Sequence, residues 1–155
     1  MTPPGHTLFP AQRSALLEDA ARRAARYLDS LATRSVAPPA AAVARLDALD
    51  TSMPATSTDA AAVLARLDDL VGPATMAMAG PRFFGFVIGG ALPATVAANW
   101  LATAWDQNAA LATATPGVSR IEAIALEWLK DVLGLPASAQ GAFVTGATMA
   151  NFTAL

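Results

Sequence analysis

The chain has 155 residues and a formal net charge of −2, and its ten basic residues are scattered, so it lacks the basic surface that nucleic acid or anionic lipid requires. It contains no cysteine, which excludes disulfides, thiolate metal sites and cysteine nucleophiles. Hydrophobic residues make up 54% of the sequence and charged residues only 14%, whereas soluble domains average about 25% charged residues. This composition predicts apolar surface that is covered by a missing segment, a partner subunit or a membrane.

The first predicted element is an amphipathic helix over residues 9–32. Its apolar positions recur at spacings of three and four: Leu16, Leu17, Ala20, Ala24, Tyr27, Leu28 and Leu31. The arginines at 22, 23 and 26 are interpreted as its solvated face. The prolines at 38 and 39 cannot continue a helix, so a linker follows.

Two short patterns, 43–49 and 63–70, resemble each other, and we interpret this single similarity as chance in an alanine-rich chain. The second pattern predicts a short packing helix from about residue 58. Ser57 or Thr58 is expected as its N-cap, and the pair 72–73, Gly-Pro, as its stop.

Residues 80–90 combine four glycines and a proline with five large apolar side chains, a pattern with neither helical nor strand period. It predicts a buried, shaped loop, in which phenylalanines are as typical of a core as of a binding site. A helix is expected over 93–105, because a proline at its first turn loses no hydrogen bond. The polar residues 106–108 then end this helix. Three tryptophans are interpreted as packing residues: Trp100, Trp105 and Trp128.

An uncharged segment, residues 83–105, is long enough to cross a membrane. The glycine pair 89–90 and Pro93 interrupt it, however, where a lipid-facing helix needs unbroken apolar cover. We therefore expect a loop and a buried helix, with no membrane span. Residues 1–6 show no basic cluster before an apolar run, so no secretory signal is apparent and a cytoplasmic location is expected.

A further amphipathic helix is predicted to begin at Thr115 or Ser119 and to end at Leu133, before Gly134. Thr115 precedes a proline and could cap the helix, while the four residues from Ser119 match a capping box. The predicted apolar face has six residues: Ile121, Ile124, Ala125, Trp128, Leu129 and Val132.

At the end of the chain, residues 141–145 are predicted to form a short buried strand that passes through a turn into a helix, an arrangement typical of α/β proteins. The first turn of a helix presents free amide donors and the positive end of the helix dipole, which together suit a phosphate. Gly146, Ala147 and Thr148 supply two nearly bare backbones and one hydroxyl there. By itself this motif is also typical of ordinary packing turns.

Three ordered segments resemble the group II pyridoxal-phosphate-dependent decarboxylases, the family of aromatic-amino-acid, glutamate and diaminobutyrate decarboxylases. They are Pro81-Arg-Phe-Phe-Gly-Phe; Thr115-Pro-Gly-Val-Ser-Arg-Ile-Glu with Trp128-Leu-Lys-Asp-Val-Leu-Gly-Leu-Pro; and Gly141-Ala-Phe-Val-Thr-Gly-Ala-Thr-Met-Ala-Asn. Order and spacing agree over about half of the chain, which is more specific than any one segment.

The resemblance implies an α/β protein of fold-type I, with a helical wrapping segment at 1–79 and the beginning of the large, mostly parallel sheet domain, which binds pyridoxal phosphate, at 80–155. It also implies a homodimer with a cross-subunit active site, which would account for the apolar composition.

For the site, the resemblance implies that the backbone and hydroxyl of Ala147 and Thr148, beside Gly146, meet the cofactor phosphate, with Asn151 as a supporting polar group. The substrate pocket would be lined by Phe84, Phe86 and Val87. Asn108 and Ala110 lie where related enzymes reach into the neighbouring active site.

The Schiff-base lysine, the aspartate for the cofactor nitrogen and the stacking histidine of the family are expected beyond Leu155, so no catalytic residue and no metal ligand is assigned in this chain. Lys130 is the only lysine and lies on the polar face of a predicted helix, where an ion-paired or solvated role is expected. His6 is the only histidine and lies near the terminus.

The leading hypothesis is decarboxylation of an amino acid, with an aromatic substrate slightly favoured by Phe84 and Phe86, as part of a longer chain. An aminotransferase, aldolase or lyase of the same fold is an alternative, because the phosphate loop does not determine which bond breaks. A non-catalytic assembly module is a second alternative.

Overall fold

The computed structural model describes residues 10–49, 52–109 and 111–155. The chain divides into two compact units, Met1–Leu92 and Pro93–Leu155, and each is described by itself. Because these units are defined by contacts alone, the predicted boundary between a wrapping segment and a cofactor-binding domain at residue 80 stays a prediction.

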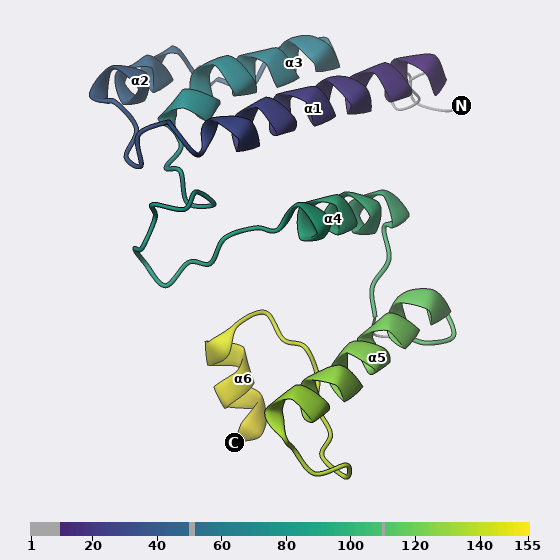
Figure 1. The fold of residues 1–155 in the computed structure, drawn as a ribbon. Coiled ribbons are helices and arrows are strands. Elements are labelled where there is room, and N and C mark those ends of the chain that lie inside the picture. Colours follow the sequence, from purple (N-terminus) through teal and green to yellow (C-terminus); the bar gives the residue numbers. More distant parts are fainter. Residues whose placement is uncertain (1–9, 50–51, 110) are drawn as a thin grey trace. The chain divides into compact units, whose positions relative to one another are not determined.

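The first unit is built on a long helix, α1 (Pro10–Ser30), as its apolar period predicts. After the linker come the short α2 (Ala40–Ala44) and a 3₁₀ turn, η1 (Arg45–Ala48). Then α3 (Ala60–Arg66) continues through a π-helical turn, η2 (Leu67–Val71), into a 3₁₀ turn, η3 (Gly72–Ala74). Helices α1 and α3 lie side by side (Figure 1).

The start of α3 differs from the prediction by one or two residues. Asp59, and not Ser57 or Thr58, is its N-cap, and the Asp59 carboxylate accepts a hydrogen bond of 3.0 Å from the amide of Ala62. An aspartate satisfies the free amide and adds a negative charge at the positive end of the helix dipole, which explains why it is preferred here.

The second unit contains α4 (Pro93–Trp105), α5 (Pro116–Leu133) and α6 (Ala147–Ala154). The bounds of α4 are those predicted. Helix α5 ends in a Schellman motif: Gly134 adopts φ 64°, its amide donates to Asp131 O, and the amide of Leu135 donates to Lys130 O. The predicted stop at glycine is therefore confirmed.

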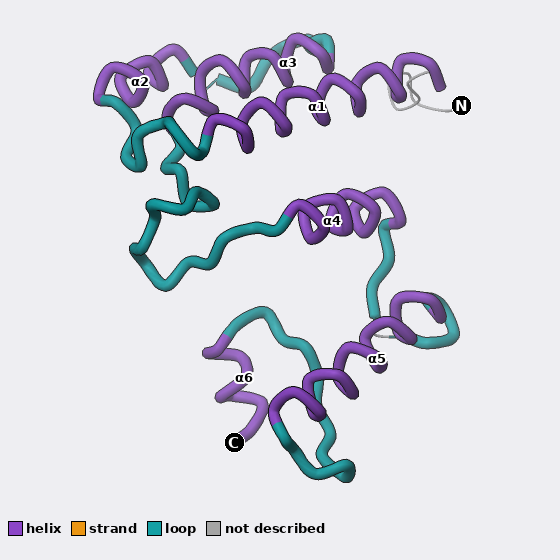
Figure 2. The backbone as a smooth tube through the Cα atoms, viewed as in Figure 1, coloured by secondary structure: helices purple, strands orange, loops and turns teal. Residues whose placement is uncertain are grey.

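The predicted strand at 141–145 is not formed. Within the described ranges the structure has helices and loops and no strand (Figure 2), and residues 141–145 are exposed. A strand is defined by hydrogen bonds to a neighbouring strand, and in the described part of the chain no other segment offers one. The sheet expected of fold-type I is therefore not seen among the described residues.

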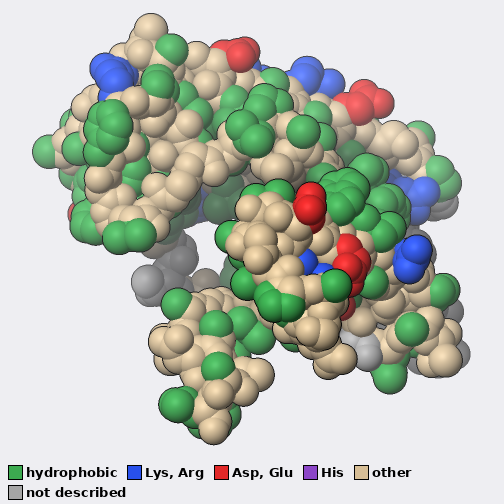
Figure 3. Space-filling model, turned by 60° about the horizontal axis from the view of Figure 1, so that its bottom comes forward, with side chains coloured by type: hydrophobic (Ala, Val, Ile, Leu, Met, Phe, Trp, Pro, Cys, Tyr) green, Lys and Arg blue, Asp and Glu red, His purple; other side chains and the backbone are tan. Residues whose placement is uncertain are grey.

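Burial also differs from the prediction. The three tryptophans expected to pack are about half exposed or more, at 45%, 51% and 71% for Trp100, Trp105 and Trp128. The predicted apolar face of α5 and the predicted buried loop at 80–90 are likewise largely open, and hydrophobic side chains are spread over the face drawn in Figure 3. These elements were placed correctly, but the surface needed to cover them is not in the described residues.

No described helix is both long enough and apolar enough to cross a membrane. The segment 83–105, considered above as a possible span, is a loop followed by the short helix α4. That arrangement is the one its glycines and proline predict.

Candidate functional site

The turn into α6 has the geometry expected of an anion-binding helix start. Gly146 is its N-cap, and the first helical hydrogen bond runs from the amide of Ala150 to Gly146 O at 3.0 Å. Among the described residues, no backbone carbonyl accepts a hydrogen bond from the amides of Ala147, Thr148 or Met149. Three exposed donors at the positive end of a helix dipole are suited to a phosphate.

No described part of the chain packs so closely against Gly146 that it would exclude a side chain there. A Cβ added to Gly146 would meet no described atom within 4 Å, and the residue has an extended backbone, with φ 161° and ψ 174°. Its missing side chain leaves the backbone open to something outside the described chain, as a phosphate cradle needs. The residues present therefore fit the phosphate end of the cofactor.

Asn151 follows Thr148 by three residues in α6, so the two side chains lie on the same face of the helix. Both side chains are exposed, as is Ala147. The structure thus brings together the four residues predicted for cofactor binding, although the role of each stays a prediction.

The segment predicted to line the substrate pocket is a loop with an unusual backbone. Phe86 and Val87 have φ angles of 58° and 56°, in a region that a β-branched residue such as valine rarely adopts and that costs about 1–3 kcal/mol. The ring of Phe86 packs on Phe83, with centroids 6.2 Å apart. Phe84 is 93% exposed and Val87 fully exposed, so the loop presents apolar side chains outward.

The segment around Asn108 is fixed to the start of α5. The Thr115 hydroxyl, which is buried, donates to the carbonyl of Asn108 and to Leu111 O, and Ser119 Oγ donates to Ala109 O at 3.0 Å. Ala110 lies outside the described residues. The capping box predicted from Ser119 is wrong, because its hydroxyl is used for this contact and α5 begins one turn earlier.

Thr115 occupies the N-cap position of α5, but among the described contacts its side chain makes no capping hydrogen bond. Its hydroxyl proton is directed backward, to the loop. Thr115 therefore serves to hold Asn108 and Leu111 against the start of α5.

Lys130 is ion-paired, as its position predicts. Its Nζ lies 2.8 Å from the Glu127 carboxylate and donates to Ala137 O at 3.0 Å. A lysine with these partners is not available to a cofactor carbonyl. His6 lies outside the described residues, and the described part of the chain has no cluster of three or more potential metal ligands.

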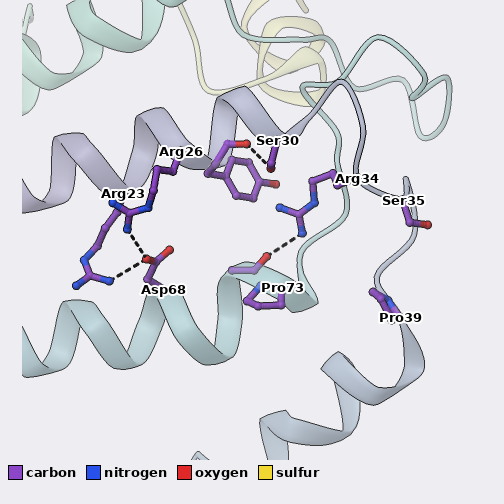
Figure 4. A pocket seen from close by; sticks show the side chains of 10 residues that line it. Arg23, Arg26, Ser30, Arg34, Ser35, Pro39, Asp68 and Pro73 are labelled. Carbon is purple, nitrogen blue, oxygen red and sulfur yellow. Dashed lines mark hydrogen bonds and ion pairs between the residues drawn. The ribbon is translucent and has the colours of Figure 1, made fainter.

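The sequence did not predict a polar network in the first unit, where α1 and the linker after it meet η2 and η3 (Figure 4). Arg23 and Arg26 both reach the Asp68 carboxylate, at 2.8 and 3.2 Å, and Arg34 donates to Gly72 O at 3.0 Å. These groups line a cavity of about 420 Å³. Two of the arginines interpreted as a solvated face therefore also join α1 to η2. Helical periodicity could not predict these pairs, because their partners are 42 and 45 positions apart in the chain.

The hydrogen bond that Arg23 Nε donates to Asp19, at 2.7 Å, lowers the pKa of that carboxyl. The same bond, together with the one to Asp68, raises the pKa of Arg23. Every described cation in this cavity therefore has an acidic or carbonyl partner, so the network is better suited to joining helices than to binding a free anion.

The comparisons with known proteins relate the chain to one class of enzyme. No family model matches it. Over 75 residues, 48% of the chain, it is 41% identical to an aromatic-L-amino-acid decarboxylase of Bacillus atrophaeus. A crystal structure of Oryza sativa TDC with PLP and tryptamine matches 91% of the chain with a TM-score of 0.75 and 26% identity.

These matches confirm the resemblance predicted from the three motifs: over part of their length, the chain is similar to pyridoxal-phosphate-dependent amino-acid decarboxylases. The similarity corresponds to an amino-terminal portion of such an enzyme. It spans only 16% of the length of the curated relative and 28% of the rice chain.

Proposed function

We propose that this chain is the amino-terminal part of a pyridoxal-phosphate-dependent decarboxylase that acts on an amino acid, with an aromatic substrate favoured. The observation that carries the proposal is the 41% identity to an aromatic-L-amino-acid decarboxylase over 75 residues. The TM-score of 0.75 to a protein solved with PLP and tryptamine supports it, as does the open helix start at Gly146.

Within this proposal the chain's residues bind and orient the phosphate end of pyridoxal phosphate. The free amides of Ala147 and Thr148 and the Thr148 hydroxyl donate to phosphate oxygens, and Asn151 supports them from the next helical turn. Phe84, Phe86 and Val87 line the substrate pocket, and Asn108 approaches it from the neighbouring subunit. The cofactor, when bound, supplies an electron sink for the loss of the carboxylate.

The quaternary and cellular parts of the proposal follow from the same relationship. The full-length protein is a cytoplasmic homodimer, residues 1–79 wrap the partner subunit, and residues 80–155 begin the large sheet domain. The exposed apolar side chains of α4 and α5 support such covering, because many large apolar side chains open to solvent are typical of surfaces that a partner or another segment covers.

The test uses the full-length protein with added pyridoxal phosphate. We expect a cofactor absorbance band and release of carbon dioxide from an aromatic amino acid. Transfer of the amino group without carbon dioxide would instead identify an aminotransferase. A protein that neither binds the cofactor nor releases carbon dioxide from any amino acid would overturn the proposal.

A matched pair of variants tests the phosphate loop. Thr148→Ala removes a hydroxyl donor to a charged group, which is worth about 1.5–3 kcal/mol, so the Kd for pyridoxal phosphate should rise by about tenfold to a hundredfold. Thr153→Ala is the control, since Thr153 lies in the last turn of α6 and its hydroxyl donates to Met149 O at 2.8 Å. Equal effects of the two substitutions would argue against the loop.

A further inference from the structure

The end of α1 is joined to the segment that follows α3 by a compact set of side-chain contacts. The Tyr27 hydroxyl lies 2.9 Å from Thr75 Oγ1 and donates to Met76 O at 3.3 Å. Arg34 Nη2 donates to Gly72 O at 3.0 Å and to Thr75 O at 3.4 Å. These contacts join residues 38 to 49 positions apart in the chain.

Arg34 uses both its plane and its edge. Its guanidinium carbon lies 4.7 Å from the centre of the Tyr27 ring, while the donors at its edge reach the two carbonyls. A planar guanidinium can stack and donate at once, whereas a lysine ammonium cannot. Arg82 joins the same set, because its Nη2 donates to Arg34 O. We call the set Tyr27, Arg34, Thr75 and Arg82 the Arg34 latch.

The latch leads directly to the base of the 81–87 loop. The amide of Ala77 donates to Val36 O at 3.0 Å, and Ala77 and Leu31 are the buried hydrophobic residues of the described chain. A Cβ on Gly80 would come within 3.1 Å of Ala77 O and 3.2 Å of Leu31 O, so any larger residue there would require these two backbone oxygens to shift. Arg82 follows Pro81 at the start of the loop, and its Nη2 donates to Arg34 O.

The loop itself is held at this base and open at its tip. The amide of Phe83 donates to Gly80 O at 3.3 Å, and the Phe83 ring contacts Phe86. Phe84, Phe86 and Val87 are exposed at 93%, 74% and 106%. The direction in which the loop starts is therefore determined by the latch, and the tip carries the side chains proposed to meet the substrate.

We propose that Tyr27 and Arg34 are positioning residues for the substrate: they hold the base of the 81–87 loop so that Phe84 and Phe86 line the pocket. This inference rests on the proposed function. The proposed role of the latch is to hold the 81–87 loop and not to bind the cofactor, so its loss should weaken substrate binding and leave the cofactor in place.

The kinetic test uses the full-length, cofactor-loaded protein and an aromatic amino acid as substrate. Arg34→Ala should raise KM about five- to tenfold and leave kcat within about twofold, since it removes binding common to ground state and transition state. Arg34→Lys should behave like Arg34→Ala, because charge without the planar fork cannot restore the latch. Tyr27→Phe keeps the stacked ring and should give a smaller rise.

Arg26→Ala is the matched control. Arg26 lies on the same helix, is exposed, and pairs with Asp68 at 3.2 Å, so its loss should leave KM unchanged. Rescue of KM by Arg34→Lys, or an equal rise in Arg26→Ala, would overturn the proposal in favour of a charge or stability effect.

A second measurement is independent of turnover. Hydrogen exchange of the 81–92 segment should become faster in Arg34→Ala and stay unchanged in Arg26→Ala, with wild-type cofactor absorbance in both. Unchanged exchange of this segment would overturn the latch even if activity fell. A wild-type protein without cofactor absorbance or carbon dioxide release would instead defeat the proposed function, whereas exchange would still report on the latch.

Discussion

The two units differ in how their helices are held. In residues 10–92, α1 and the segments after α3 are joined by long-range polar contacts through Arg23 and Arg34, around the buried Leu31 and Ala77. Among the described residues of 93–155, the side-chain hydrogen bonds named above are local, such as the one that joins Ser119 to Ala109. The first unit can hold its shape through its own contacts, whereas the second depends on surface from elsewhere.

The formation of a helix and the burial of its apolar face have different sources in this chain. Helix α5 forms because its proline, its periodicity and its terminal glycine act locally. Its apolar face nevertheless stays open, since burial needs a second surface. A segment can thus carry its own helix signals and still lack the partner that stabilises it.

The largest expected difference lies in hydrogen exchange of the isolated 155-residue chain in dilute solution. Amides in the second half of α1 should exchange at least about tenfold more slowly than those in α4 and α6, because protection follows the free energy of local opening. Mass spectrometry of peptides from both units measures this. Equal protection in the two units would contradict the view that only the first unit holds its shape through its own contacts.

Trp128→Ala tests the missing cover of α5 directly, because the same substitution can be made in the isolated chain and in the full-length protein. In the isolated chain Trp128 is 71% exposed, so its loss should change stability by less than about 0.5 kcal/mol. In the full-length protein, where we expect the sheet domain to cover α5, the cost should be about 3–5 kcal/mol.

Thermal and denaturant unfolding of the four proteins, wild type and variant in each length, provide the measurement. A small effect in both lengths would mean that Trp128 stays exposed and that the sheet domain does not cover this face of α5.

Helix positions and the phosphate turn could be predicted because their signals are local. Pro93 and Pro116 mark helix starts, Gly134 marks an end, and small residues at 146–148 follow a predicted turn. The Arg34 latch could not be predicted, since its partners are distant in the sequence and most of them are backbone carbonyls, which have no residue signature. The prediction of a strand at 141–145 was wrong, because a strand needs a neighbouring strand to pair with and the local sequence pattern does not show whether one is present.

Gly134→Ala tests a local signal in the second unit, where long-range support is weak. A side chain at φ 64° is strained, so the substitution should lower the free energy of unfolding by about 1 kcal/mol. Gly117→Ala is the matched control: Gly117 lies in α5, and a Cβ there meets no described atom within 4 Å.

The control substitution should stabilise α5 by about 0.5–1 kcal/mol, because alanine loses less backbone entropy in a helix. Thermal unfolding followed by circular dichroism compares the two. Opposite signs are expected, and a loss in both would show that the first turn of α5 needs its glycine for another reason.

The smallest expected effect tests the polar network of the first unit through its pH dependence. The hydrogen bond from Arg23 lowers the pKa of Asp19. A carboxyl with a lowered folded pKa contributes stability above its unfolded pKa, about 4, and loses that contribution as the pH falls through the lower folded value. Acid should therefore weaken the contact between α1 and its neighbours.

Asp19→Asn removes this contribution, so its melting temperature should change less than that of the wild type between about pH 4 and about pH 2. Glu18→Gln is the control, because that carboxylate reaches Arg22 only at 4.0 Å. Since both partners of the Asp19–Arg23 pair are partly exposed, the difference should shrink further in high salt. An Asp19→Asn variant with the wild-type acid profile would show that the first unit keeps its stability without the Asp19–Arg23 pair.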